Sequence, residues 1–194
     1  MKRIFVFLLV SVLATSIFAQ QQGKVRGGLD LGVCVPRGGG GICMDIPIGY
    51  NIRDNMNVGI KGGAAFMAKV DPFGDTGSLS ANVNLLGTFT YFFSSGESSF
   101  APFVGGGTGI YAVGGLSVGT NDVSVELGPR IGVLLTAGFE LSKFRMAAEY
   151  NIVTRSAVKV NSTGVEVENS YIKNSYLAIT VGFYIGGGKW KKQK

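Results

Sequence analysis

Apolar and polar residues alternate with a period of two along most of the chain. Between positions 25 and 35 every second residue is apolar or glycine, and positions 42–52 repeat the pattern. This is the period of a β-strand that has one apolar and one polar face. No helical period competes with it, so the pattern predicts an all-β fold.

The same pattern predicts eight strands. They are expected at 24–35, 42–52, 57–69, 79–93, 100–113, 129–141, 144–154 and 175–185. The fifth is rich in glycine and carries no charge on either face, so its faces stay unassigned. Each length suits the roughly 9 to 11 residues with which a tilted strand crosses a bilayer.

The turns preserve the two faces across each hairpin. Ser142 and Lys143 are expected to form a two-residue turn, and positions 53–55 a three-residue turn. A hairpin within the last connection sets Lys159 opposite Glu166. The same register, carried down without a bulge, places Glu149 opposite Tyr176.

The connections also alternate in length. Those at 36–41, 70–78, 114–128 and 155–174 are mostly longer than those at 53–55, 94–99 and 142–143. Bacterial outer-membrane barrels have short periplasmic turns and longer outer loops. An even strand count then places both termini in the periplasm.

Ionised residues fall on one face of the predicted strands only. They are Arg26, Asp30, Asp45, Lys61, Lys69, Arg130, Glu140, Arg145 and Glu149. A membrane barrel turns its apolar face to lipid, whereas a soluble β-sandwich buries that face. The period alone does not separate these two folds.

The first residues favour the membrane barrel. Lys2 and Arg3 precede an apolar stretch at 4–13, and small residues follow up to Ala19, which is the pattern of a secretory signal peptide. The stretch is shorter than the roughly 20 apolar residues of a membrane-spanning helix. We predict a signal peptide at 1–19 and one barrel domain at 20–194 that ends in a short basic tail.

Composition supports a membrane protein that crosses with strands. Charged residues make up 15 % of the chain, against about 25 % in an ordinary soluble domain. A closed barrel satisfies every backbone group in lipid without helices. The predicted fold is therefore an eight-stranded antiparallel up-and-down transmembrane β-barrel, integral to a bacterial outer membrane.

Seven aromatic residues cluster toward the predicted periplasmic strand ends and would form an interfacial girdle. They are Tyr50, Tyr91, Phe93, Phe100, Phe139, Phe144 and Phe183. The structural alternative is that they are core aromatics of a soluble barrel.

At this point the chain resembles the small eight-stranded outer-membrane barrel family that includes OmpX-like proteins and the transmembrane half of OmpA-like proteins. The resemblance rests on the signal peptide, the run Pro102-Phe103-Val104-Gly105, the hairpin at 139–150 and the closing strand at 176–185. It implies outer-membrane lipids and the barrel assembly machinery as partners. The family commonly ends on an aromatic residue, whereas this chain continues past Tyr184 into a basic tail. No peptidoglycan-binding domain follows the barrel, so a wall-anchoring role does not carry over.

The inward charges predict a network of ion pairs and hydrogen bonds that plugs the lumen, because eight strands enclose just enough room for side chains. Its predicted members are Arg26, Asp30, Asp45, Lys61, Lys69, Arg130, Glu140, Arg145 and Glu149, joined by Thr88, Thr90, Thr136 and Tyr184. Cys34 and Cys43 also face inward, and pairing Val33 with Met44 sets them directly opposite each other. A disulfide is predicted there, with two buried free thiols as the alternative.

The chain contains no histidine, which removes Ser-His-Asp chemistry and imidazole metal sites. We expect no enzymatic activity, no cofactor and no metal site. The net charge of +6 includes the signal and tail residues, so nucleic acid is not an expected partner.

Three functions follow from these features. The first is a structural or surface-interaction barrel whose outer loops, chiefly 114–128 and 155–174, contact an extracellular protein. The second is a narrow pore for ions or small solutes, since glycines on the inward face could leave gaps. The third, a soluble barrel around an apolar ligand, conflicts with the charged inward face.

Overall fold

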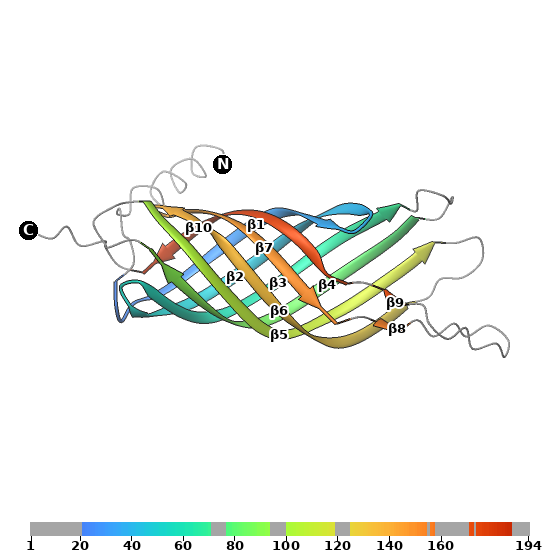
Figure 1. The fold of residues 1–194 in the computed structure, drawn as a ribbon, viewed down its shortest axis with the longest axis horizontal. Coiled ribbons are helices and arrows are strands. Elements are labelled where there is room, and N and C mark those ends of the chain that lie inside the picture. The colour runs from blue at the N-terminus through green and yellow to red at the C-terminus, as the bar shows by residue number, and fades with distance from the viewer. Residues whose placement is uncertain are drawn as a thin grey trace, which may run out of the picture.

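The computed structural model describes residues 21–70, 77–93, 100–118, 125–154, 156–157, 171–172 and 174–187. Within them the chain forms ten strands (Figure 1). They are β1 (Val25–Pro36), β2 (Gly39–Arg53), β3 (Met56–Val70), β4 (Gly77–Phe92), β5 (Phe100–Val118), β6 (Val125–Leu141), β7 (Phe144–Val153), β8 (Ser156–Ala157), β9 (Tyr171–Ile172) and β10 (Tyr176–Gly186). Across these described ranges, no helix is long and apolar enough to cross a membrane.

Eight of these strands close into a barrel in the order β1-β10-β7-β6-β5-β4-β3-β2, and β8 pairs with β9 in a separate small sheet. Every neighbouring pair is antiparallel. The barrel closes where β1 meets β10, from Arg26 opposite Gly186 to Pro36 opposite Tyr176. Closure pairs the two strands that would otherwise be sheet edges. The predicted eight-stranded antiparallel barrel is confirmed.

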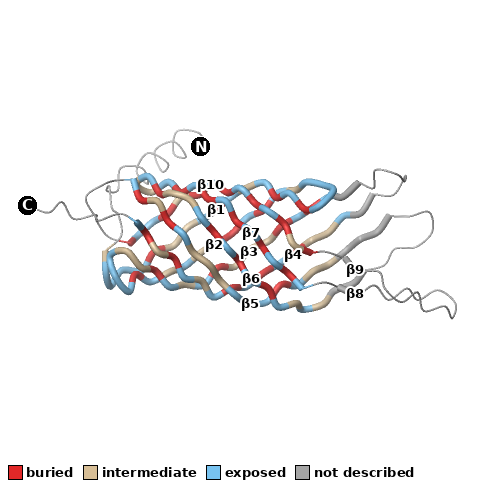
Figure 2. Tube along the Cα trace, in the orientation of Figure 1, coloured by how far each residue is buried: buried red, intermediate tan, exposed pale blue. Residues whose placement is uncertain are grey.

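The barrel is apolar outside and polar inside. Buried and exposed residues alternate along each strand (Figure 2). The outward side chains of Leu31, Ile60 and Leu135 are at least half exposed, whereas the inward Asp30 and Glu149 are each 2 % exposed. A contiguous apolar exterior of this kind is unusual for a soluble monomer.

The structure assigns the faces of β5, which the sequence leaves open. Phe103 and Tyr111 point inward and are buried, whereas Val104 and Ile110 point outward and are exposed. The inward positions between them are mostly glycine. This glycine content hides the period of two from a hydropathy pattern.

Two of the predicted loops are largely strand. β5 continues to Val118 and β6 begins at Val125, so most of the predicted loop 114–128 is paired. β2 begins at Gly39, which leaves Arg37 and Gly38 as the whole turn after β1. The predicted alternation of loop lengths is therefore wrong at the first connection. It is also wrong after β3 and β5, where six residues join the strands against seven between β4 and β5, while the connection after β7 is long as expected. The glycines at 39–41 were expected in the connection 36–41, whereas Gly41 pairs in β2 where a side chain would collide with the backbone of β3.

The register between β1 and β2 differs from the prediction by two residues. Val33 lies opposite Ile42, not Met44, so Cys34 faces Gly41 and Cys43 faces Gly32. The cause is the tight turn, in which Gly38 adopts φ +81°. A register shift of two residues keeps both cysteines on the inward face. It places them diagonally across the β1–β2 pair instead of directly opposite each other.

The register between β7 and β10 is also corrected by two residues. Glu149 lies opposite Ala178, and Tyr176 lies opposite Asn151. The small β8–β9 sheet, with Ser156 opposite Ile172, is one residue out of that register, so the expectation of a ladder without a bulge is wrong. Side chains bridge the irregularity: Ser175 Oγ accepts a hydrogen bond from Val153 N at 3.2 Å, and Asn174 Nδ2 donates to the Thr154 carbonyl at 3.1 Å. The predicted pair Lys159 and Glu166 lies outside the described residues.

Both ends of the described chain lie at the barrel end that carries the short turns (Figure 1). The predicted turn at Ser142 and Lys143 is confirmed, with Ser142 at φ 57°. The predicted three-residue turn at 53–55 is instead a two-residue turn, with an irregularity between Asn51 and Arg53. The predicted signal peptide at 1–19 and the tail from position 188 lie outside the described residues.

Candidate functional site

Several buried polar side chains converge in the lumen, and we call this set the charged network. Its members are Arg26 and Asp30 on β1, Asp45 on β2, Lys61 on β3, Glu140 on β6, Arg145 and Glu149 on β7, and Tyr184 on β10. All are 9 % exposed or less. They meet because each occupies an inward position of its strand, although the chain separates them by up to 158 positions.

Near the short-turn end, Arg26 and Glu140 form a two-pronged ion pair. Arg26 Nη2 lies 2.6 Å from Glu140 Oε1, and Nη1 donates to Oε2 at 3.1 Å. The Arg145 guanidinium approaches the same carboxylate at 4.0 Å. A forked pair of this kind fixes orientation as well as charge, so it holds β1 and β6 together across the lumen.

Aromatic rings lie against both guanidinium groups. Arg26 Cζ lies 4.3 Å from the Tyr184 ring centroid, and Arg145 Cζ lies 4.2 Å from that of Phe103 and 5.4 Å from that of Tyr184. Phe92 is 5.7 Å from Arg26 Cζ. Cation–π contacts become stronger when both partners are desolvated, as they are here.

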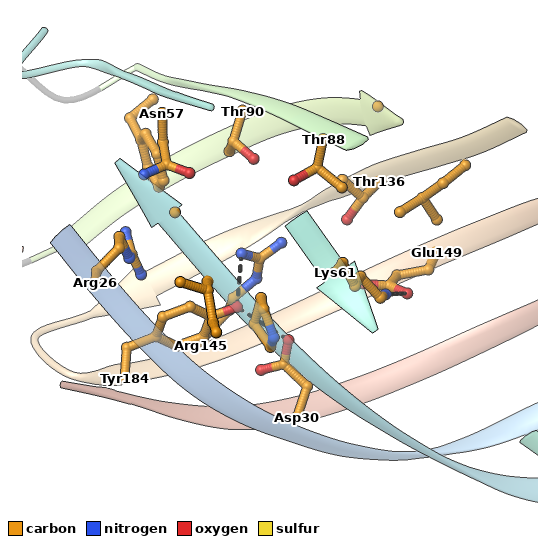
Figure 3. A pocket seen from close by; sticks show the side chains of 16 residues that line it. Arg26, Asp30, Asn57, Lys61, Thr88, Thr90, Thr136, Arg145, Glu149 and Tyr184 are labelled. Carbon is orange, nitrogen blue, oxygen red and sulfur yellow. Dashed lines mark hydrogen bonds and ion pairs between the residues drawn. The ribbon is translucent and has the colours of Figure 1, made fainter. Parts of the chain in front are cut away.

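The Tyr184 hydroxyl connects two charges of opposite sign (Figure 3). Arg145 Nη1 donates to this hydroxyl at 3.0 Å, and the hydroxyl donates to Asp30 Oδ2 at 3.0 Å. The Asp30 charge is thus balanced through a hydrogen-bond relay rather than by direct contact.

Farther along the lumen, one lysine serves two carboxylates. Lys61 Nζ lies 2.9 Å from Asp45 Oδ2 and also pairs with Glu149. Asp45 lies on β2, the neighbour of β3, whereas Glu149 lies on β7, so the pair of Lys61 with Glu149 crosses the lumen. The ammonium is buried among them and offsets charges that would otherwise repel each other.

Inward glycines make room for this network. A Cβ at Gly63 would collide with the Asp45 carboxylate, and one at Gly182 with that of Asp30. Similarly, Tyr184 lies over Gly28, and Tyr111 over Gly132. The sequence suggested that such glycines might leave gaps, but neighbouring side chains fill the space beside them.

Asparagines extend the polar lining beyond the charges. Asn57 Nδ2 donates to Asn51 Oδ1 at 2.8 Å, and the Tyr111 hydroxyl donates to Asn151 Oδ1 at 2.8 Å. Sequence reasoning did not name Asn51, Asn57, Asn151 and Tyr111, because to the charged residues it added only three threonines and Tyr184. The three asparagines lie an even number of positions from Asp45, Lys61 and Glu149 on the same strands, and this spacing would have placed them on the inward face.

A cavity of about 30 Å³ remains inside the network, room for about two water molecules. Asp30, Lys61, Thr136, Arg145 and Glu149 are among its lining residues. Asp30 Oδ1, Thr136 Oγ1 and Arg145 Nε have no hydrogen-bond partner within the described part of the chain. Ordered water is the usual partner of such buried groups.

Two other predicted members, Arg130 and Lys69, are not among the described contacts of the charged network. Arg130 is half-buried near the opposite end of β6 from Glu140, opposite Tyr111 in the β5–β6 register. The Lys69 side chain lies outside what the structure describes. Of the predicted uncharged members, Thr90 and Thr136 are buried, and Thr88 lines the cavity beside them.

The predicted disulfide partners are close to each other without a bond. Cys34 and Cys43 are both buried free thiols. The predicted direct pairing is wrong because of the register described above, which sets the two residues diagonally across β1 and β2.

Three solved structures of bacterial proteins are similar to this chain. The outer membrane protein OprG from Pseudomonas aeruginosa is 16 % identical, with a TM-score of 0.49, covering 86 % of this chain and 98 % of that one. Neisserial surface protein A is 16 % identical, with a TM-score of 0.47 and coverages of 88 % and 97 %. The N-terminal β-barrel domain of Pseudomonas aeruginosa OprF is 16 % identical, with a TM-score of 0.46 and coverages of 86 % and 100 %. No protein-family model and no curated protein matches the sequence.

Proposed function

We propose that this chain is an integral protein of a bacterial outer membrane, in which the barrel is the anchor and the charged network closes the lumen. The observation that carries the proposal is the inverted distribution of polarity. Aliphatic side chains such as Ile60 and Leu135 face out, while Arg26, Lys61 and Glu140 are buried inside. In hydrocarbon, a closed barrel satisfies its backbone and exposes only apolar side chains.

Aromatic contacts support an orientation with the short turns in the periplasm. The Tyr91 and Phe93 rings lie 5.2 Å apart, and Phe100 and Phe139 lie 5.4 Å apart, all near that end of the barrel. Aromatic girdles occupy membrane interfaces. In the proposed orientation both termini are periplasmic, and outer-membrane lipids and the barrel assembly machinery are the expected partners.

The proposed role is structural or one of surface interaction. The long connection after β7 and the extended β5–β6 hairpin would face outward, where they could contact an extracellular protein. The charged network supports an anchor rather than a conduit, because its ion pairs span the lumen between β1 and β6 and between β3 and β7.

A narrow pore for ions or small solutes is the second candidate. It is favoured by the small polar cavity and by the buried polar atoms that lack protein partners in the described chain. A water-filled cavity conducts only when it continues to both ends of the barrel. The paired side chains of Arg26 and Glu140 oppose that continuity near the short-turn end.

Two measurements on the folded protein test these proposals. Membrane-extracted protein should migrate differently on a detergent gel before and after boiling, because a folded membrane barrel resists unheated detergent. In planar bilayers, the same preparation should give no steady conductance steps. Recovery in the soluble fraction without a mobility shift would refute the membrane anchor, whereas a mobility shift with steady steps would favour the pore.

A further inference from the structure

Three sulfur-bearing side chains meet in the lumen beyond the charged network. Cys34 lies on β1, Cys43 on β2 and Met67 on β3. All are buried, and they belong to one packed cluster with Ala65, Tyr176 and Ala178, which we call the sulfur cluster. The charged network does not use any of the three sulfur atoms.

A glycine lets the backbone of β3 approach closely beside the sulfur atoms. Cys34 is opposite Gly41, and Gly41 is opposite Met67, so the three form one row across β1, β2 and β3. Above the missing side chain, Cys34 Sγ reaches to 4.0 Å from the carbonyl oxygen of Phe66 on β3. The Cys34 thiol is also within hydrogen-bonding reach of the Cys43 thiol.

Two alanines face the cysteines. Cys43 faces Ala65 across the β2–β3 pair, and Cys34 faces Ala178 across the β1–β10 pair. The two thiols and the thioether therefore share a buried part of the lumen with these alanines and the Tyr176 ring.

The donor set selects a soft cation. No group of three or more His, Cys, Asp or Glu residues within the described chain could hold a metal ion, and Zn²⁺ would need a fourth nitrogen or sulfur ligand or an open position. Thiolate and thioether sulfur favour Cu(I). We propose that Cys34, Cys43 and Met67 form a three-sulfur binding site for Cu(I).

Binding requires proton release but no electron transfer. Each coordinating thiol gives its proton to water, and copper stays in the monovalent state. Exchange of two protons for one monovalent ion adds one negative charge to the site. Burial opposes this charge at Cys43, as do the Asp45 and Glu149 carboxylates, and the Lys61 ammonium offsets part of it.

The site is close to the barrel end opposite the short turns. Cys34 precedes Pro36, the last residue of β1, by two positions, and Met67 precedes Val70, the last residue of β3, by three. At about 3.3 Å per residue, each lies within roughly 10 Å of its strand end. An ion can therefore reach the site from that end without crossing the ion pair of Arg26 and Glu140.

The test is a competition for Cu(I) between the folded barrel and the chromogenic chelator bicinchoninate. The protein is reduced in detergent, freed of reductant under anaerobic conditions and added to the Cu(I)–chelator complex. The wild type should withdraw one Cu(I) per chain. Cys34→Ser and Cys43→Ser should abolish withdrawal, and Met67→Leu should weaken binding by at least about tenfold, since loss of even an outer partner of a metal ligand costs that much.

Met44→Leu is the matched control, because Met44 points outward and is 46 % exposed. Its Cu(I) affinity should equal that of the wild type, and the gel shift on boiling verifies that every variant is folded. The site is refuted if the wild type withdraws no copper, if Met67→Leu binds like the wild type, or if Met44→Leu binds as weakly as Met67→Leu. It is also refuted if thiol counting shows a Cys34–Cys43 disulfide that persists in the reduced, folded barrel. None of these results would alter the gel shift, so the site and the membrane anchor are tested separately.

Discussion

The charged network and the sulfur cluster occupy the same lumen but are held together by different physics. In the network, Arg26, Glu140 and Lys61 depend on specific partners at hydrogen-bonding distance. In the cluster, Cys34 and Met67 pack against alanines and a tyrosine. The residues of both regions occupy inward-facing positions on the barrel strands. The barrel architecture therefore does not determine whether a section of the lumen is filled by charged or by apolar side chains.

The difference shows where the lumen tolerates change. A buried ion pair is sensitive to the loss of either partner, because the remaining charge stays in a dry environment. Methionine and free cysteine act as small, adaptable apolar groups. We therefore expect the stability of the barrel to depend strongly on the network and weakly on the identity of residues in the cluster.

The largest effect is expected for Lys61→Met. This change leaves the Asp45 and Glu149 carboxylates without the ammonium that both contact. Loss of one partner of a buried ion pair costs about 3 to 5 kcal/mol. The free energy of unfolding, measured by urea titration of the barrel in lipid vesicles, should fall by that amount.

Two further variants distinguish charge from packing. Lys24→Met removes an exposed lysine just before β1 and should leave the free energy of unfolding nearly unchanged. The triple variant Lys61→Met, Asp45→Asn, Glu149→Gln removes the charges together and should recover much of the loss. Equal stability of Lys61→Met and Lys24→Met would show that the network does not stabilise this section of the lumen.

A smaller effect is expected for Gly182→Ala. The added methyl group would collide with the Asp30 carboxylate and disturb its hydrogen bond with Tyr184. Overpacking of this kind typically costs about 1 to 3 kcal/mol, measured by the same urea titration. Gly62→Ala is the control, because a Cβ there meets no atom within 4 Å. If both variants unfold alike, the glycine is not needed to seat Asp30.

The sequence predicted the fold well because the period of two survives wherever one face is apolar. It left the faces of β5 unassigned, because glycine conceals the period there, and it ended a strand too early where glycines continue it, as at Gly39 and Gly41 in β2. Hydropathy is also insensitive to a register shift of two, which keeps every side chain on its face. That insensitivity explains why Cys34 was predicted to face Cys43 but lies opposite Gly41.

The side chains that face the lumen were easier to predict than the ion pairs that they form there. The charges of Arg26, Lys61 and Glu149 marked the inward face directly, but the partner of each depends on how the strands are staggered around the barrel. Arg26 on β1 pairs with Glu140 on β6 across the lumen, and no local pattern contains that information. Glycines on neighbouring strands, which seat the carboxylates, are readable only once the register is known.

The smallest effect is expected for Met67→Leu, in the sulfur cluster. Leucine has nearly the volume of methionine and keeps the contact apolar, so the exchange should cost less than about 1.5 kcal/mol in the urea titration. Met146→Leu, which changes an outward side chain on β7 that is 39 % exposed, controls for the exchange itself. A cost as large as that of Lys61→Met would mean that the cluster is as specifically packed as the network. A small cost combined with weakened Cu(I) binding would show instead that the thioether is retained for its sulfur rather than for its shape.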